Sequence, residues 1–264
     1  APVQLNVGFR EPLVPELGSG QSPLATADIS DLTPPKVMRE PINFAVGDLG
    51  LAEIPARGIV LIGDVPSPEI AGQAMELADE CGWPCISEPS GNALAGATAI
   101  PAAAVLLADE EFRTSHAPDL LLTVGRFGIS RPIMKLVALA DHHLAVNVGG
   151  KDRPDPLRTA ATILPAVPRP PDGDPVVGRA PRDDRWLRDW LTKSSEAQQR
   201  VGAAIADGPF SGLAVTATCW AGMDSDDLIF AAASRTVRNL EATMTPRHFP
   251  PWVIGNRGTS GIDG

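Results

Sequence analysis

Cysteine is scarce in this chain, which has only Cys81, Cys85 and Cys219 among its 264 residues. An odd number of cysteines in a chain of this length argues against a disulfide framework and fits a reducing compartment, the cytoplasm. Cys81 and Cys85 lie in the segment CGWPC, where three residues separate them instead of the two of a thioredoxin-like motif. We therefore expect both to be small buried residues and not a redox centre.

Basic charge and long apolar runs are also in short supply. Lys and Arg number 22 against 32 Asp and Glu, which gives a net charge of -10 and a pI of about 4.8. Nucleic-acid binders usually carry a basic patch, and none is apparent in the sequence. No apolar run approaches the roughly 20 residues of a membrane helix. We therefore expect no nucleic-acid partner and no transmembrane segment. The opening APVQLNVGFREP does not resemble a signal peptide, and the missing initiator Met suggests a cut chain.

Short motifs that identify a catalytic class are missing from the sequence as well. It contains no GxGxxG, GxxxxGK[ST], HExxH, CxxC or EF-hand loop. Ser115 and His116 are neighbours in sequence, which by itself says nothing about their geometry. His142 and His143 are predicted to end a helix, and we expect them to face water or the helix C-terminus. From these motifs alone, we identify no catalytic residue and no metal site in the chain.

The middle of the chain alternates short apolar segments with helical patterns. Strands are predicted at 58–63, 83–87, 119–125 and 143–149. The segment EIAGQAMELADECG has apolar residues at helical spacing and ends on Gly82, and a further helix is predicted from Arg131 to Asp141. Such units are typical of a parallel sheet with right-handed crossovers. The predicted fold class is α/β, with a doubly wound, Rossmann-like parallel sheet over 41–165.

Proline-rich stretches separate this region from its neighbours. A strand is predicted at 2–9, and a Gly/Ser/Pro stretch follows to about residue 41. A second linker, 165–185, precedes an amphipathic helix at 184–206. A shorter helix at about 211–221 and strands at 227–234 and 251–256 complete the pattern. Because the chain stops in a loop straight after a strand, we expect this last part to be only the opening part of a second α/β domain.

Arginines stand beside glycine and small residues at three of the predicted strand ends. They are Arg126 and Arg131, Arg235 and Arg238, and Arg257. Parallel sheets bind ligands at the carboxyl ends of their strands, and the planar guanidinium suits carboxylates. Two interpretations stay open at this point: the arginines bind a polyanionic small molecule, or they pair with surface Asp and Glu.

The last nine residues read Asn256-Arg257-Gly258-Thr259-Ser260-Gly261-Ile262-Asp263-Gly264. This string closely resembles the N-R-G-x-S-G-I-D-G signature of the 2-succinyl-5-enolpyruvyl-6-hydroxy-3-cyclohexene-1-carboxylate synthase family of menaquinone biosynthesis. Other stretches resemble the family in the same order: PVQLNV with REPL near the N-terminus, GWP with EPSG, WLRDW, and the turn 234–238. The turn departs from the family's S-N-x-x-R, because Arg235 replaces asparagine. The resemblance spans essentially the whole chain.

The resemblance implies how this chain is divided. The whole protein would have pyrimidine-binding, central and pyrophosphate-binding domains, and would form a homodimer or homotetramer in the cytoplasm. The implied division is 1–15 for the last strand of the first domain, 16–40 for a linker, 41–165 for the central domain, 166–183 for a Pro-rich linker and 184–264 for the truncated third domain. The activating glutamate and the metal motif would lie outside the chain, which we therefore expect to be inactive alone.

The resemblance also implies chemistry and site residues. The family uses thiamine diphosphate with Mg²⁺ or Mn²⁺ to decarboxylate 2-oxoglutarate and add the succinyl unit to isochorismate. Residues matching its substrate-binding positions are Arg131, Ser234, Arg238 and Arg257, and those matching cofactor positions are Ser260 and Ile262. Whether Arg235 or Arg238 faces substrate stays open. As a hypothesis, Arg126 and Arg153 form a regulatory site for an anionic pathway product.

Two other functions remain as alternatives. The chain could come from another thiamine-diphosphate decarboxylase, which shares the three-domain plan but lacks the terminal signature. It could also be a non-catalytic module that binds an anion or a nucleotide, although no glycine fingerprint follows GIVLIG.

Overall fold

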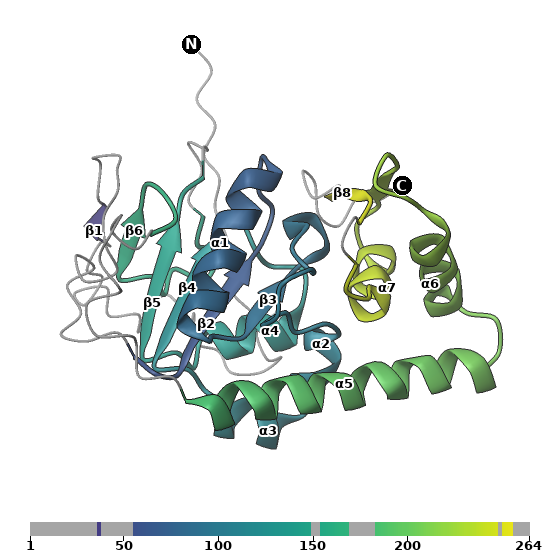
Figure 1. The fold of residues 1–264 in the computed structure, drawn as a ribbon, viewed down its shortest axis with the longest axis horizontal. Coiled ribbons are helices and arrows are strands. Elements are labelled where there is room, and N and C mark those ends of the chain that lie inside the picture. Colours follow the sequence, from purple (N-terminus) through teal and green to yellow (C-terminus); the bar gives the residue numbers. More distant parts are fainter. Residues whose placement is uncertain (1–35, 38–54, 149–153, 169–182, 248–249, 256–264) are drawn as a thin grey trace, which may run out of the picture. The chain divides into compact units, whose positions relative to one another are not determined.

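The computed structural model describes residues 36–37, 55–148, 154–168, 183–247 and 250–255, all within the compact unit Pro35–Gly264. Their main sheet is wholly parallel, with strand order β1–β6–β5–β4–β2–β3 (Figure 1). The strands are β1 (Lys36–Val37), β2 (Gly58–Ile62), β3 (Cys85–Ser87), β4 (Leu120–Val124), β5 (His142–Val146) and β6 (Thr162–Leu164). From β2 the chain adds β3 on one side and β4 on the other, so the predicted doubly wound α/β fold is confirmed.

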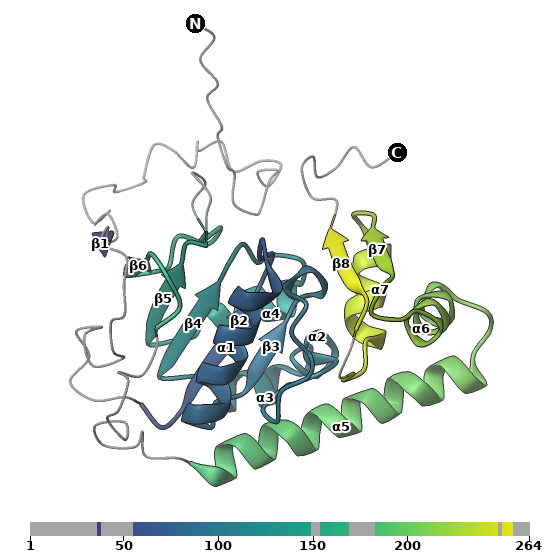
Figure 2. The same ribbon diagram turned by 45° about the horizontal axis from the view of Figure 1, so that its top comes forward.

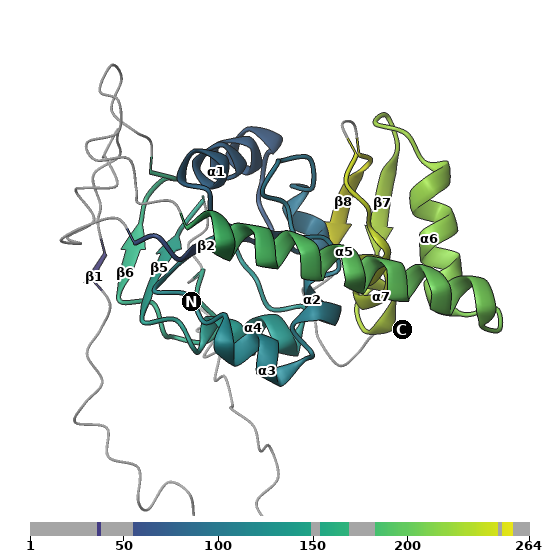
Figure 3. The same cartoon turned by 60° about the horizontal axis from the view of Figure 1, so that its bottom comes forward.

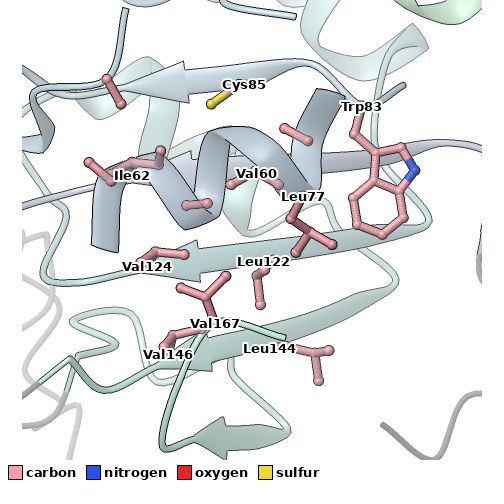
Figure 4. Close-up of a cluster of buried hydrophobic side chains, with 14 of the residues drawn as sticks. Val60, Ile62, Leu77, Trp83, Cys85, Leu122, Val124, Leu144, Val146 and Val167 are labelled. Carbon is pink, nitrogen blue, oxygen red and sulfur yellow. The ribbon is translucent and has the colours of Figure 1, made fainter. Parts of the chain in front are cut away.

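Helices cover both faces of this sheet, which explains why its strands are apolar throughout. The helix α1 (Pro68–Cys81) lies on one face, and α4 (Arg131–Val137) lies on the other (Figure 3). Val60 and Ile62 lie on the side of the sheet that faces α1, in one buried cluster with Leu77, which lies nearer to Val60 (Figure 4). The alternate residues of β2 pack on the opposite side with α4, α2 (Ala103–Leu106) and α3 (Glu110–Ser115). Burial of each of these aliphatic side chains stabilises the folded state by about 1.5–3 kcal/mol.

The ends of α1 follow from its sequence. Pro68 occupies the first turn, where its missing N–H costs nothing, and Glu69 complements the helix dipole there. Gly82 ends the helix at φ 67°, a left-handed conformation that glycine adopts without strain, as predicted. Cys81 and Cys85 are buried and free, and burial raises the pKa of the Cys85 thiol to about 12. The prediction of small buried cysteines is confirmed.

Several local expectations were wrong. The helix predicted to reach Asp141 ends at Val137. His142 and His143 begin β5 and do not end a helix, and His143 is buried, so it does not face water. Its ring bonds to Thr123 Oγ1 at 3.0 Å and to Thr159 Oγ1 at 2.8 Å. The strand β1 also lies within the stretch expected to be linker, where it pairs with β6.

The long helix α5 (Asp184–Asp207) packs its N-terminal half against the main sheet's second face. Asp183 begins it by accepting the backbone N–H groups of Arg185 and Trp186. Trp186 and Trp190 are buried in the same cluster as the helices α2, α3 and α4. Among the described helices, none combines the length and apolar character that a membrane span requires.

Beyond α5, two parallel strands and two helices form a smaller unit (Figure 2). Its elements are α6 (Gly212–Gly222), β7 (Leu228–Ala231), α7 (Arg235–Thr243) and β8 (Trp252–Gly255). The helix α7 is the crossover that parallel strands require, and it packs with Trp220 and Val253. Leu228, Phe230 and Ile254 are exposed by 54%, 62% and 39%, so the described residues leave an apolar face of this pair of strands about half exposed.

Candidate functional site

The reversal of strand order brings Asp64 and Arg126 together at the carboxyl edge of the main sheet. The Asp64 N–H donates to the Arg126 carbonyl at 2.8 Å, and the Arg126 N–H donates back at 3.1 Å. Gly125 permits this approach, because it has φ +75° and a Cβ there would collide with the Asp64 carbonyl oxygen. The loops that follow β2 and β4 are therefore joined by backbone hydrogen bonds at the edge where doubly wound sheets usually bind ligands.

The side chains of this pair remain at the surface. Both residues are exposed at the surface. The pKa of the Asp64 carboxyl is raised, because the partial desolvation of this group outweighs the opposing effect of the Arg126 charge. The nearby carboxylate partly neutralises Arg126, which weakens the case for an anion site built on this arginine alone. Arg153 lies outside the described residues, so the regulatory site remains a prediction.

The loop after β4 is fixed by a buried carboxylate that sequence reasoning missed. Glu88 is 1% exposed, and its Oε1 accepts the backbone N–H groups of Gly128 at 2.9 Å and Ile129 at 2.6 Å. The loop then enters α4, whose first residue, Arg131, is exposed. An acidic residue directly after the buried strand β3 is the signal that could have identified Glu88.

The same loop is contacted from the smaller unit by Arg238. Its Nε donates to the Ile129 carbonyl at 3.2 Å, and its Nη1 donates to the Ser234 carbonyl at 2.7 Å. These bonds use two of the five N–H donors of the guanidinium group, which leaves donors for a ligand. Arg235, the other candidate, is exposed on the first turn of α7. Arg238 is thus the one tied to the loop that leads to Arg131.

Ser234 has an unusual conformation at the start of α7. Its φ is 72° and its ψ is -127°, a region that residues other than glycine rarely adopt, and its hydroxyl does not cap the helix. Such strain costs on the order of 1–3 kcal/mol and concentrates at functional sites. An exposed hydroxyl at a helix N-terminus beside an arginine is suited to an anionic group.

Strand register relates Ser234 to the terminal signature. Ala231 of β7 and Gly255 of β8 are register partners, so both strands end at the same edge. Ser234 follows three residues after Ala231, and the signature begins with the residue after Gly255. The signature residues themselves, including Arg257, Ser260 and Ile262, lie outside the described part. Of the predicted substrate residues in the described part, Arg238 contacts both the loop that leads to Arg131 and the carbonyl of Ser234.

Ser115 and His116 do contact each other, at 3.0 Å between Oγ and Nδ1. However, the Ser115 hydroxyl donates to the Glu111 carbonyl of its own helix at 2.7 Å. The His116 ring stacks on Phe112, with centroids 4.0 Å apart, and burial lowers its pKa. The pair is packed as part of the helix end and not arranged as a nucleophile with its base. In the described part of the chain, no three His, Cys, Asp or Glu residues cluster as metal ligands.

Comparisons with known proteins agree with the resemblance seen in the sequence. No family model matches the chain. The curated 2-succinyl-5-enolpyruvyl-6-hydroxy-3-cyclohexene-1-carboxylate synthase of Thermobifida fusca is 34% identical over 278 residues, covering 100% of this chain and 45% of the relative. In sequence, this chain belongs with these synthases. The enzymes of the same name from Kineococcus radiotolerans and Rubrobacter xylanophilus are 32% and 30% identical, again over 100% of this chain and over 44% and 47% of their own lengths.

The chain spans about half the length of the curated synthases it matches. What this part contributes to the activity of a whole synthase is therefore a matter of proposal.

Proposed function

We propose that this chain is part of a thiamine-diphosphate-dependent synthase that decarboxylates 2-oxoglutarate and adds the succinyl unit to isochorismate in menaquinone biosynthesis. The observation that carries the proposal is similarity over the whole chain to synthases with this product in their name. The described residues contribute to substrate binding, and the 264-residue chain is inactive alone.

The arginines around the loop between β4 and α4 support this assignment. Both substrates are carboxylates, and arginine binds carboxylates through two parallel N–H donors. Arg238 is held by the Ile129 and Ser234 carbonyls, so its guanidinium loses little freedom when a carboxylate binds. Arg131, two residues after Ile129, adds a second positive charge from the main sheet's side, and the Ser234 hydroxyl adds a donor.

The cofactor is assigned by family and not by the described residues. Ser260 and Ile262 lie outside the described part, and the described residues form no cluster of metal ligands. They do not by themselves fit thiamine diphosphate and Mg²⁺. We therefore derive no reaction step through the cofactor and confine the roles proposed here to substrate carboxylates.

The alternative of a nucleotide-binding module is less well supported. A nucleotide would be expected between the loops that follow β2 and β4, and the Asp64–Arg126 backbone bridge joins these loops instead of leaving them apart. The alternative of another thiamine-diphosphate decarboxylase is disfavoured because three relatives at 30–34% identity carry the synthase name.

Substrate kinetics of Arg238 variants test the proposal, in a polypeptide that extends this chain to the length of its curated relatives. Loss of charge-assisted hydrogen bonds in Arg238→Ala should raise the KM for 2-oxoglutarate or isochorismate about 10- to 100-fold, since each such bond contributes about 1.5–3 kcal/mol. Arg238→Lys should restore only part of the lost substrate affinity, because lysine lacks the two parallel N–H donors of the guanidinium group. Arg200→Ala, an exposed arginine on α5, is the matched control and should change neither KM. An Arg238→Ala enzyme with both KM values unchanged would contradict the assigned role.

A further inference from the structure

The side chain of Asn92 pairs with the backbone of β8 as a neighbouring strand would. Its Oδ1 accepts the Val253 N–H at 2.7 Å, and its Nδ2 donates to the Val253 carbonyl at 3.1 Å. Nδ2 also donates to the Ser90 carbonyl at 3.0 Å, which orients the amide. Asn92 follows the single turn η3 (Pro89–Gly91) and has φ 54°, a conformation that asparagine tolerates better than most residues.

These bonds join two parts of the chain that are 161 residues apart. One edge of β8 pairs with β7, and Val253 turns its N–H and carbonyl to Asn92 on the other edge. The backbone of Gly255 runs against Ser90, whose Oγ would be 3.8 Å from a Cβ built there. The Val253 side chain is 2% exposed and packs in one cluster with Leu94. Side chain and backbone of β8 are therefore both held by the segment after β3.

The position of this contact gives it functional meaning. Val253 precedes the first signature residue, Asn256, by three positions. We propose that Asn92 is a positioning residue, which fixes the end of β8 and thereby sets where the signature segment begins relative to the Arg131 loop. The role in the reaction rests on the proposed function, because substrate and cofactor contacts of the signature come from it. A small displacement of binding groups is sufficient to lower activity.

Two variants separate the side chain from the backbone conformation. Asn92→Gly keeps the positive φ and removes all three side-chain bonds. Asn92→Asp keeps an acceptor for the Val253 N–H but replaces the donor with an oxygen that repels the Val253 carbonyl. Arg158→Gly is the matched control, because Arg158 is exposed and has a similar φ of 58°.

Amide hydrogen exchange of the 264-residue chain tests the contact itself. In Asn92→Gly, the Val253 amide should exchange about tenfold faster, while β2 amides keep their protection. Asn92→Asp should give a smaller acceleration, and Arg158→Gly should leave β8 unchanged. Unchanged exchange at Val253 in Asn92→Gly would overturn the proposal. An equal loss of protection in β2 and β8 would also overturn it, since Asn92 would then act on global stability alone.

Kinetics of the extended polypeptide test the consequence for the site. Asn92→Gly should lower kcat/KM for 2-oxoglutarate about tenfold, mainly through KM, with Arg158→Gly as active as wild type. Faster exchange at Val253 with an unchanged kcat/KM would overturn the positioning role. An inactive wild-type enzyme would refute the proposed function instead, and the exchange result would still decide whether Asn92 holds β8.

Discussion

Replacing Glu88 should loosen the loop that supports the candidate site. Its Oε1 accepts two backbone N–H groups, at 2.9 and 2.6 Å, from a position that is 1% exposed. Hydrogen bonds to a charged group contribute about 1.5–3 kcal/mol each, and Glu88→Ala leaves two N–H groups without their acceptor. We expect Glu88→Ala to lower the free energy of unfolding by about 3–5 kcal/mol. Glu88→Gln, which keeps an acceptor oxygen and loses the charge, should cost about 1–2 kcal/mol.

Urea unfolding of the chain, followed by tryptophan fluorescence, measures both variants. The midpoint should fall while the slope with urea concentration stays constant, because the surface exposed on unfolding is similar. Glu76→Ala, an exposed glutamate on α1, should change the free energy by less than about 0.5 kcal/mol. A loss below about 1 kcal/mol in Glu88→Ala would refute the reasoning that this carboxylate holds the loop.

Three further variants test other parts of the structure. Burial lowers the pKa of His143 to about 4, below the unfolded value near 6.5. The protein should therefore lose on the order of 3 kcal/mol of stability as the pH falls from 6.5 towards 4. The urea midpoints at pH 7 and pH 4.5 should differ less in His143→Gln than in the wild type, and an identical pH dependence in the two proteins would contradict this. Ser234→Gly should raise the unfolding free energy by about 1 kcal/mol by relieving a φ of 72°, whereas a lower thermal midpoint would show that no strain is stored there. Gly125→Ala should cost more than about 2 kcal/mol in urea unfolding, because its φ is +75° and a Cβ would meet the Asp64 carbonyl, and a near-neutral effect would argue against the backbone bridge.

The parts of the fold that sequence predicts well are those with one strong periodic signal. The apolar run of β2 and the helical spacing of α1 are long enough to be distinguished from loops. The helices α2 and α3 are four and six residues long, too short for such a period to show. The start of α7 was equally hard to predict, because Ser234 enters it with a backbone conformation that sequence statistics assign to glycine.

The residues of the candidate site also differ in how far the sequence predicts them. Arginines at strand ends drew attention to Arg131 and Arg238, but only the family resemblance singled them out, and their role in substrate binding stays a prediction. The position of Glu88 directly after a buried strand marks it as a candidate, but the backbone groups that it binds lie about 40 residues away and are not apparent in the sequence. Asn92 leaves no such signal, because its partner Val253 lies 161 residues away. Those partners become adjacent only once the strand order is known.

The central claim is most directly tested by product formation from 2-oxoglutarate and isochorismate. The assay compares the 264-residue chain with a polypeptide extended to the length of the curated relatives, each with thiamine diphosphate and Mg²⁺. We expect the extended polypeptide to release CO₂ from 2-oxoglutarate and to form the succinyl adduct with isochorismate, and the 264-residue chain to do neither. An extended polypeptide that folds and binds thiamine diphosphate but forms no adduct would contradict the proposed function.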